Sequence, residues 1–327
     1  MLRLPPFEYR RVGSAVEAAE ILAGEGPEAR LVAGGTDLWP NMKRRHQMAK
    51  TVVGLHNIPE LLGVQMNGEL RVGAMTTLAN TAADQELRQG FPALAEAIES
   101  ISSPPLRNMG TLGGNLCVDT RCTYYNQTEH WRQSIDYCMK AEGTVCWVAP
   151  SSPRCWAHAA SDAAPMLCAL GARIRLVSKD GDRVIPLASL YKDDGIEYLT
   201  RRHDEVLTDV LVPASASVNN GCRSAFFKLR RRGSIDFAVL SVAAALWPDS
   251  SGNIERLSLW LGAVASAPVE VNLGDLAGQT LNDEVIADIA SRARKAATPM
   301  DNTDFRTQWR GQMVAVHTED VLRRLVL

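Results

Sequence analysis

The sequence predicts a mixed α/β fold divided into two lobes. Helical patterns alternate with short apolar strand patterns along much of the chain, and this alternation is typical of α/β architecture. A segment rich in Ser, Asn and Ala, residues 212–221, has the composition of a linker between lobes. With 327 residues, the chain is long enough for two or three subdomains that need no covalent cross-links for stability.

The first elements follow one another as helix, strand and loop. Residues 14–24 place apolar side chains at helical spacing after a serine cap. Residues 29–43 predict a buried strand that runs into a glycine turn, and residues 51–58 predict a second strand. Residues 69–84 predict a strand and the start of a capped helix, and residues 91–101 form an amphipathic helical pattern.

The later elements are separated by a loop with many glycines and prolines. Residues 101–115 predict this loop, which ends in a paired-glycine turn that a helix cannot easily cross. Residues 158–190 predict an apolar helix and then a hairpin around a Lys-Asp-Gly turn. Beyond the linker, residues 222–247 predict a strand, a basic turn and an apolar segment. Residues 254–264 predict another strand, and the C-terminal part has helical periodicity.

Composition excludes several classes of partner. The chain is 46% hydrophobic and 22% charged with a formal net charge of -2, so neither nucleic acid nor an anionic membrane is expected. The first residues lack the apolar core of a signal peptide, and no apolar run is long enough for a membrane helix. We therefore expect a cytoplasmic protein. In a reducing compartment, seven cysteines indicate metal or redox chemistry more than disulfides.

Two glycine turns share one design, at residues 33–37 and 111–115. Each has a strand end or loop, two successive glycines and a small polar residue. Adjacent glycines let backbone N–H groups converge on a ligand without a Cβ in the way, which suits a pyrophosphate. Taken singly, each is more often an ordinary tight turn, because neither matches the spacing of the Rossmann or Walker loops.

Taken together, the motifs resemble a known family. Residues 31–43, 71–80, 107–116 and 204–213, in this order, are similar to motifs of the FAD-binding medium subunit of the molybdenum hydroxylases. This family includes carbon monoxide dehydrogenase, xanthine dehydrogenase and the aldehyde oxidoreductases. The resemblance covers nearly the whole chain and extends into the second lobe at residues 226–246.

The resemblance implies a mixed α+β fold with FAD between two subdomains of the first lobe. These subdomains would cover about 1–56 and 57–215, and a smaller C-terminal lobe, residues 220–327, would close over the flavin. Both glycine turns would hold the FAD diphosphate. The residues that match these diphosphate loops are Ala33, Gly34, Gly35, Thr36, Asp37, Thr111, Gly113, Gly114 and Asn115.

The resemblance implies that two further residues lie near the flavin. Asp162 matches an aspartate near the ribityl or ribose hydroxyls, where an acceptor-only carboxylate suits a sugar diol. It is equally suited to cap the apolar helix that follows it. Lys228 matches a position near the isoalloxazine ring, where a cation would stabilise anionic reduced flavin; a solvated surface lysine is the common alternative.

The chain departs from the family pattern in an insertion at about residues 117–158, which contains Cys122, Cys138, Cys146 and Cys155. Four thiolates are the ligand set of a structural zinc or of a 4Fe-4S cluster. Zinc sites usually have close CxxC pairs, and the insertion has none. The insertion is also poor in aliphatic side chains, so a bound group would hold it together. We favour a 4Fe-4S cluster, because a redox centre beside a flavin has a use.

The other cysteines and the aromatic residues are interpreted separately. Cys117 either approaches the flavin or replaces Cys122 as a ligand, whereas Cys168 and Cys222 are expected to be core residues. His130 and His158 are expected to be solvent-facing or hydrogen-bonded rather than metal ligands. Six aromatic side chains are expected to pack the insertion and shield a cluster from water: Tyr124, Tyr125, Trp131, Tyr137, Trp147 and Trp156.

The insertion is similar to that of one branch of the family, the 4-hydroxybenzoyl-CoA reductases. That resemblance implies electron flow from ferredoxin through a 4Fe-4S cluster and FAD to a 2Fe-2S subunit and a molybdenum subunit, assembled as a dimer of heterotrimers. No catalytic residue is expected on this chain. The alternative is the FAD subunit of a xanthine, aldehyde or CO dehydrogenase that delivers electrons to NAD or a quinone and has a zinc-stabilised loop. A binding module with a decayed FAD site is the third possibility, and the two intact glycine turns argue against it.

Overall fold

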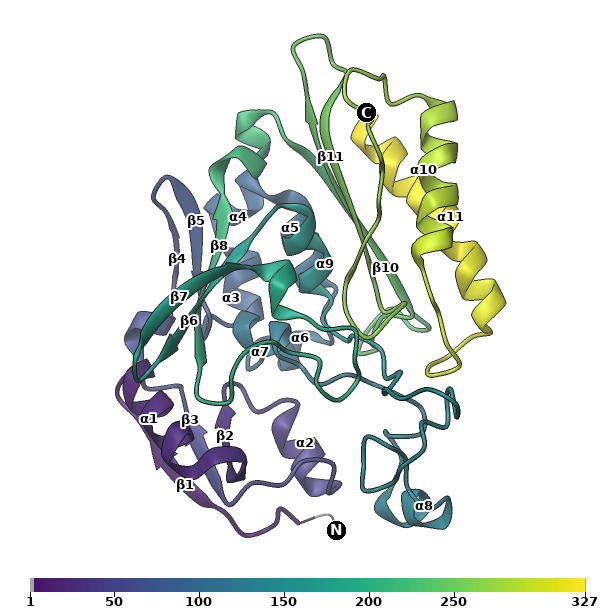
Figure 1. The fold of residues 1–327 in the computed structure, drawn as a ribbon. Helices are drawn as coiled ribbons and strands as arrows, with labels where there is room; N and C mark the ends of the chain where they lie inside the picture. Colours follow the sequence, from purple (N-terminus) through teal and green to yellow (C-terminus); the bar gives the residue numbers. More distant parts are fainter. Residues whose placement is uncertain (1–2, 327) are drawn as a thin grey trace.

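Three β-sheets organise the chain, and the computed structural model describes residues 3–326. The first sheet is parallel with strand order β1-β3-β2, and it lies at the purple end of the ribbon in Figure 1. Its strands are β1 (Glu8–Arg11), β2 (Ala29–Val32) and β3 (Thr51–Gly54). Helix α1 (Ala15–Glu25) connects β1 to β2, and its cap is Ser14, whose side chain accepts a hydrogen bond from the Glu17 amide. The predicted helix and strands of this region are therefore confirmed.

The second sheet has five strands in the order β4-β5-β8-β6-β7, and every neighbouring pair is antiparallel. Its strands are β4 (Val64–Met66), β5 (Glu69–Gly73), β6 (Arg173–Ser178), β7 (Gly181–Pro186) and β8 (Val206–Pro213). The predicted hairpin is confirmed as β6 and β7. The alternation of helical and strand patterns did not predict the direction of pairing in this sheet. Periodicity shows which segments are strands, whereas strand direction depends on how the chain returns to the sheet.

Helices fill the space between the second sheet and the second lobe. They are α3 (Leu78–Ala83), α4 (Gln85–Gly90), α5 (Pro92–Glu99), α6 (Pro104–Arg107), α7 (Leu112–Leu116) and α9 (Ala163–Ala169). All seven residues of α9 are buried, because the helix contacts α5 on one side and strands of the third sheet on the other. This explains why its sequence is apolar all round rather than amphipathic.

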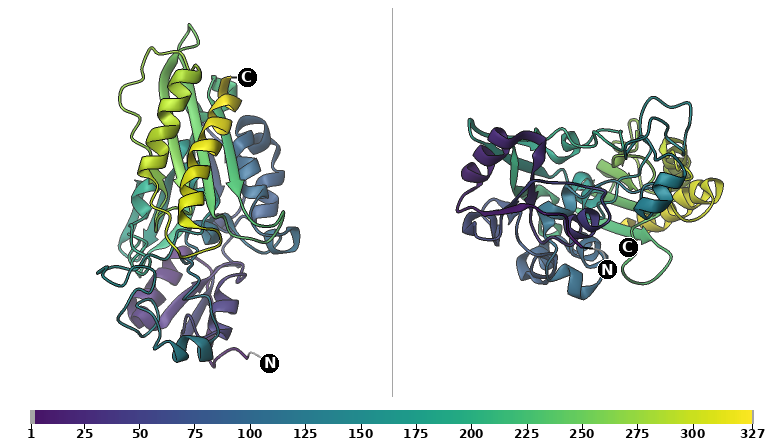
Figure 2. Two further views of the ribbon diagram at one scale, coloured as in Figure 1. Left: turned by 90° about the vertical axis from the view of Figure 1, so that its right-hand side faces the viewer. Right: turned by 90° about the horizontal axis from the view of Figure 1, so that it is seen from below.

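The third sheet forms the second lobe and is antiparallel in the order β12-β11-β10-β9. Its strands are β9 (Arg223–Leu229), β10 (Leu240–Pro248), β11 (Ile254–Gly262) and β12 (Val269–Glu270). Two helices, α10 (Asp283–Ala296) and α11 (Thr307–Val326), cover its outer face, as Figure 2 shows. The predicted mixed fold with a C-terminal lobe is thereby confirmed. No helix within residues 3–326 has both the length and the apolar character needed to cross a membrane.

The insertion is mostly irregular and contains one short helix, α8 (Glu129–Ser134), at the lower right of Figure 1. It has its own small buried cluster, which includes three of the four cysteines with Tyr125 and Ala157. Two buried groups attach it to the segment that follows α2 (Leu38–Lys43): Arg132 Nη2 donates to the Arg44 carbonyl at 2.9 Å, and the Tyr125 hydroxyl donates to the His46 carbonyl at 3.1 Å. The insertion is therefore anchored to the first subdomain.

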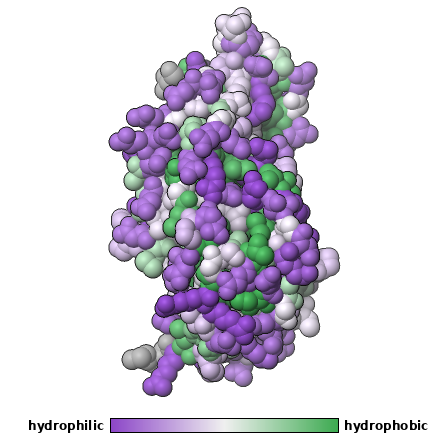
Figure 3. Space-filling model, turned by 90° about the vertical axis from the view of Figure 1, so that its left-hand side faces the viewer, coloured by the Kyte–Doolittle hydropathy of each residue, from purple (hydrophilic) through white to green (hydrophobic). Residues whose placement is uncertain are grey.

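The surface is mainly polar. On the face shown in Figure 3, hydrophilic side chains cover both ends of the molecule, and apolar side chains are exposed near the middle. Exposed apolar residues are ordinary on folded proteins, so these alone do not indicate a site.

Candidate functional site

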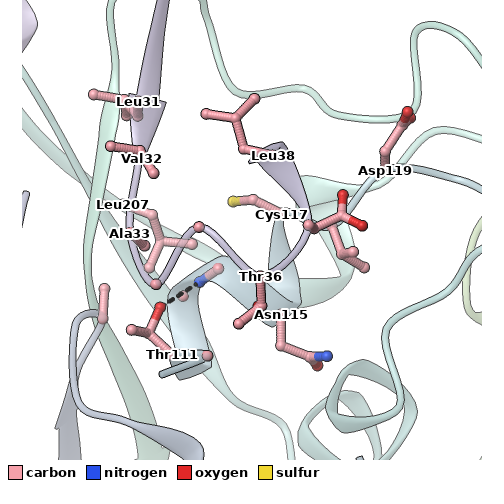
Figure 4. Close-up of a pocket in the computed structure, with 18 of the residues that line it drawn as sticks. Leu31, Val32, Ala33, Thr36, Leu38, Thr111, Asn115, Cys117, Asp119 and Leu207 are labelled. Atoms are coloured by element: carbon pink, nitrogen blue, oxygen red, sulfur yellow. Dashed lines mark hydrogen bonds between the residues drawn. The ribbon is translucent and has the colours of Figure 1, made fainter. Parts of the chain in front are cut away.

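A cavity of about 320 Å³ lies where the two glycine turns meet, within the size range of small-molecule sites. Its wall comes from β2 and the turn after it, from α7 with its preceding loop, from residues 198–207, and from Phe237 of the second lobe. Figure 4 shows Ala33, Thr36, Thr111 and Asn115 around this space. Both subdomains and the second lobe therefore contribute to one cavity.

All nine glycine-turn residues predicted to hold the diphosphate line this cavity. A Cβ on Gly34 would collide with the Met109 carbonyl, and a Cβ on Gly110 would lie 3.4 Å from Thr36 Oγ1. Gly35 has φ +70°, a left-handed conformation that favours glycine. The glycines thus let the two turns approach each other and present backbone to the cavity, as a cradle for a diphosphate requires.

The second glycine pair lies inside a helix, and the expectation that a helix could not cross it was wrong. Thr111 is the N-cap of α7, and its hydroxyl accepts a hydrogen bond from the Gly114 amide at 3.1 Å, drawn as a dashed line in Figure 4. A Cβ on Gly113 would come within 2.6 Å of Ala74 Cβ. The cap and the close packing beside β5 together offset the low helix propensity of the two glycines.

Several residues that line this cavity were not predicted from the sequence. They are Asp119, Tyr198, Leu199, Arg201, His203, Leu207 and Phe237. The basic run at residues 201–203, just before the family motif of residues 204–213, was the available signal. Cys117, which was left ambiguous, also lines this cavity, and burial raises the pKa of its thiol. Cys117 therefore lies on the side of the insertion that faces this cavity.

Asp162 and Lys228 form a buried ion pair at 2.8 Å, and neither is among the residues that line the cavity. Lys228 Nζ also donates to the Ser100 carbonyl at 3.0 Å. Asp162 precedes α9, but its side chain makes no capping hydrogen bond there. Burial raises the Asp162 pKa, and the Lys228 charge opposes that rise. In the structure the pair joins β9 to the first lobe, and direct contact of either residue with a flavin stays a prediction.

Arg121, at the base of the insertion, connects three parts of the site. Its guanidinium pairs with Asp37 of the first glycine turn and donates to Asn41 Oδ1 at 3.3 Å. It also lies 4.9 Å from the ring centroid of Phe237, which is within cation–π range. The first turn, the insertion and the second lobe therefore meet at one side chain.

The four cysteines of the insertion line a second, smaller cavity. Its other lining residues are Tyr124, Tyr125, Met139, Lys140, Trp147 and Val148. All seven cysteines of the chain are free, and these four are buried. Within residues 3–326, no three His, Cys, Asp or Glu side chains are grouped so that they could hold a metal ion. The four thiols therefore border a shared space without converging on the position of a single ion.

Local contacts fix two of these thiols. A hydrogen bond between Cys155 and Cys146 lowers the pKa of Cys146, and the Ala157 amide donates to Cys155 Sγ at 3.5 Å. A Cβ on Gly195 would lie 2.6 Å from Cys155 Sγ, so the position of this sulfur depends on a glycine outside the insertion.

The aromatic and histidine residues of the insertion divide as follows. Three of the six predicted aromatic side chains line the cavity that the four cysteines border, which we call the thiol cavity; they are Tyr124, Tyr125 and Trp147. The ring centroids of Trp131 and Tyr124 are 6.4 Å apart, and Trp131 itself does not line the cavity. His130 is exposed, whereas His158 is buried, and burial lowers its pKa to about 4. His130 is thus solvent-facing and His158 Nδ1 lies 3.0 Å from the Ala159 carbonyl, the two environments that the sequence analysis expected.

The cavity, with its paired glycine turns and its wall from three structural units, has the form that a diphosphate-containing cofactor requires. Residues 5–215 match the family described as the FAD binding domain in molybdopterin dehydrogenase, and the chain belongs to this family. Residues 224–325 match the CO dehydrogenase flavoprotein C-terminal domain.

Known proteins are similar over almost the whole chain. The xanthine dehydrogenase FAD-binding subunit of Escherichia coli O157:H7 is 26% identical over 97% of this chain and 95% of that protein. The aldehyde oxidoreductase FAD-binding subunit PaoB of Escherichia coli K12 is 31% identical over 82% of this chain and 85% of that protein. A solved carbon monoxide dehydrogenase from Hydrogenophaga pseudoflava has the same fold, with a TM-score of 0.80 and 22% identity over 99% of this chain and 98% of that chain.

Proposed function

We propose that this chain is the FAD-carrying electron-transfer subunit of a molybdenum-containing oxidoreductase of the xanthine or CO dehydrogenase type. The observation that carries the proposal is the cavity between the glycine turns, whose wall includes every residue expected at the FAD diphosphate. FAD held there by the two glycine turns would supply a two-electron carrier that can pass its electrons on singly.

The chain's own residues bind and orient the cofactor. Backbone of the two glycine turns can reach the diphosphate because no Cβ intervenes at Gly34 or Gly35. Arg121 holds Asp37 in place, and Phe237 closes the wall from the second lobe. The role of this chain is electron transfer, and the substrate would be bound by another subunit.

The partners follow from this role. One relative is named the carbon monoxide dehydrogenase medium chain, which implies other chains in that enzyme. We propose that this chain assembles with a molybdenum-cofactor subunit and a 2Fe-2S subunit, as a dimer of heterotrimers, and that electrons leave to NAD or a quinone.

The test is the cofactor content and the reactivity of the purified complex. We expect about one FAD per chain and absorbance changes of the flavin on addition of substrate. Flavin reduction by NADH would support a dehydrogenase that delivers electrons to NAD. A colourless protein that takes up no FAD would overturn the proposal.

A second candidate is favoured by the four thiols that border one cavity. In it the chain is the flavin subunit of a 4-hydroxybenzoyl-CoA reductase, and Cys122, Cys138, Cys146 and Cys155 hold a 4Fe-4S cluster that accepts electrons from ferredoxin. The partner's reaction consumes 4-hydroxybenzoyl-CoA, two electrons and two protons and yields benzoyl-CoA and water. The four thiols border a space of about 10 Å³ without meeting at one point, and a single zinc ion requires four ligands around one point, whereas the four cysteine ligands of a 4Fe-4S cluster bind four different irons.

Iron, acid-labile sulfide and zinc per FAD separate the two candidates. About four irons and four sulfides per FAD, resolved from any 2Fe-2S subunit, would support the reductase. Zinc near one per chain without iron would support the dehydrogenase type with a zinc-stabilised loop.

Substitution of one ligand tests the same assignment. We expect Cys138→Ser to lose the iron of this chain and to keep FAD. Cys138 does not line the cavity between the two glycine turns, in which we propose that FAD binds and which we call the flavin cavity. The control is Cys222→Ala, which removes a buried thiol in the second lobe and should keep both cofactors. Loss of flavin and fold together in Cys138→Ser would mean that the cysteine is structural.

A further inference from the structure

Lys140 is a buried lysine in the insertion whose charge is fully paired. Its side chain is 6% exposed, and Nζ donates to Asp119 Oδ1 at 2.7 Å, to Thr120 Oγ1 at 2.8 Å and to the Gly195 carbonyl at 2.6 Å. An ammonium group has three donors, so each has an acceptor. The position of this positive charge is therefore fixed.

Lys140 also lies between the two cavities. Nζ is 5.0 Å from the ring centroid of Tyr125 and 5.5 Å from that of Tyr198, both within cation–π range. Tyr125 and Lys140 line the thiol cavity, whereas Tyr198 and Asp119 line the flavin cavity. One ammonium group and its contacts thus form the partition between the two sites.

Packing alone does not explain a charged residue at this place. Burying an ion pair costs desolvation energy that an apolar pair of similar volume would avoid. Lys140 lines the same cavity as the four thiols, so its fixed positive charge lies beside any group that they hold. Electrostatic interaction is strong here because the surroundings are largely shielded from water.

We propose that Lys140 is an electrostatic positioning residue that raises the reduction potential of the group held by the four thiols, and that Asp119 limits this rise. The proposal rests on the iron–sulfur cluster of the second candidate function. Adding one electron makes that group more negative, so a fixed positive charge beside it stabilises the reduced form. Each transfer to the flavin moves one electron, and Lys140 neither gains nor loses a bond or a proton.

The test uses the complete complex and measures the midpoint potential of the cluster by redox titration followed by EPR, together with iron and FAD per chain. We expect Lys140→Met to keep both cofactors and to shift the potential to more negative values, and Lys140→Arg to stay near the wild type. Asp119→Asn should shift the potential in the opposite direction, because it leaves the ammonium without its counter-charge. Lys179→Met, at an exposed lysine paired with Asp180 in the β6-β7 turn, is the control and should change nothing.

The opposite signs distinguish electrostatics from a loss of structure, which would move both variants the same way. Unchanged potentials in Lys140→Met and Asp119→Asn, with both cofactors bound, would overturn the role of Lys140 and leave the cluster in place. If Lys140→Met loses iron, Asp119→Asn decides: a higher potential supports the proposal, and an equal or lower one overturns it. A wild-type chain without iron would overturn the second candidate function and this proposal with it.

Discussion

At the scale of single residues, glycines decide how closely the walls of the flavin cavity approach. We expect Gly34→Ala to abolish FAD binding, because its Cβ would collide with the Met109 carbonyl, a backbone atom that cannot rotate away. FAD per chain after purification is the measurement. Gly24→Ala is the matched control, since Gly24 lies in α1 with nothing near its added Cβ, and there alanine should stabilise the helix by about 1 kcal/mol.

A second glycine is predicted to act on the thiol cavity. Gly195→Ala would place a Cβ 2.6 Å from Cys155 Sγ and 2.8 Å from the Ala157 amide nitrogen. Overpacking of this kind costs about 1–3 kcal/mol. If the four thiols hold the cluster of the second candidate function, displacing Cys155 should lower the iron content while FAD stays bound. The measurement is iron and FAD per chain. Gly233→Ala, with no atom within 4 Å of the added Cβ, should retain both. Full iron content in Gly195→Ala would show that Cys155 tolerates the shift.

At the scale of elements, one isolated β-bridge, between Arg121 and His158, joins the two ends of the insertion, which we call its neck. Arg121 and His158 exchange backbone hydrogen bonds of 2.9 and 2.8 Å, which bring the two ends of the insertion together. The His158 ring is buried, with Nδ1 3.0 Å from the Ala159 carbonyl, and the Arg310 and Arg121 cations act on it. The neck therefore encloses an imidazole that is held neutral.

This neutral histidine predicts acid sensitivity. Burial lowers the His158 pKa from 6.5 to about 4, so below pH 6.5 the unfolded chain binds more protons than the folded one. Stability should fall as the pH drops from about 6.5 to 4, by roughly 3 kcal/mol for this residue. Urea unfolding at pH 7 and pH 4.5 measures the loss, and His158→Gln should lose less than the wild type. His130→Gln, at an exposed position of α8, should behave like the wild type; equal losses in all three proteins would contradict the prediction.

At the scale of the whole molecule, one cavity joins all three sheets. The first glycine turn follows β2, α7 packs beside β5, and Phe237 lies between β9 and β10. FAD should therefore stabilise the chain as a unit, by about 2.7 kcal/mol at one hundred times its Kd, and raise the Tm in a single transition. Calorimetry of the chain in its complex, with and without added FAD, measures the effect. Riboflavin, which lacks the diphosphate, is the control and should raise the Tm less. Two transitions of which FAD shifts one would mean that the second lobe is not coupled to the cavity.

The sequence by itself determined the local elements and the residues of the glycine turns. Periodicity and caps predicted the helix after Ser14 and the β6-β7 hairpin, because these depend on neighbours in the chain. The ordered motifs predicted the family. They also predicted the turn residues of the flavin cavity, which line it in the structure.

Only the tertiary structure decided what depends on contacts between distant segments. It made the second sheet antiparallel, placed the glycine pair of residues 113–114 inside a helix, and paired Asp162 with Lys228 away from the cavity. It also brought Lys140 between Tyr125 and Tyr198, which line different cavities and lie far apart in the chain. Periodicity describes one segment at a time, whereas strand direction, burial and the partner of a charge are set by whichever segment packs against it.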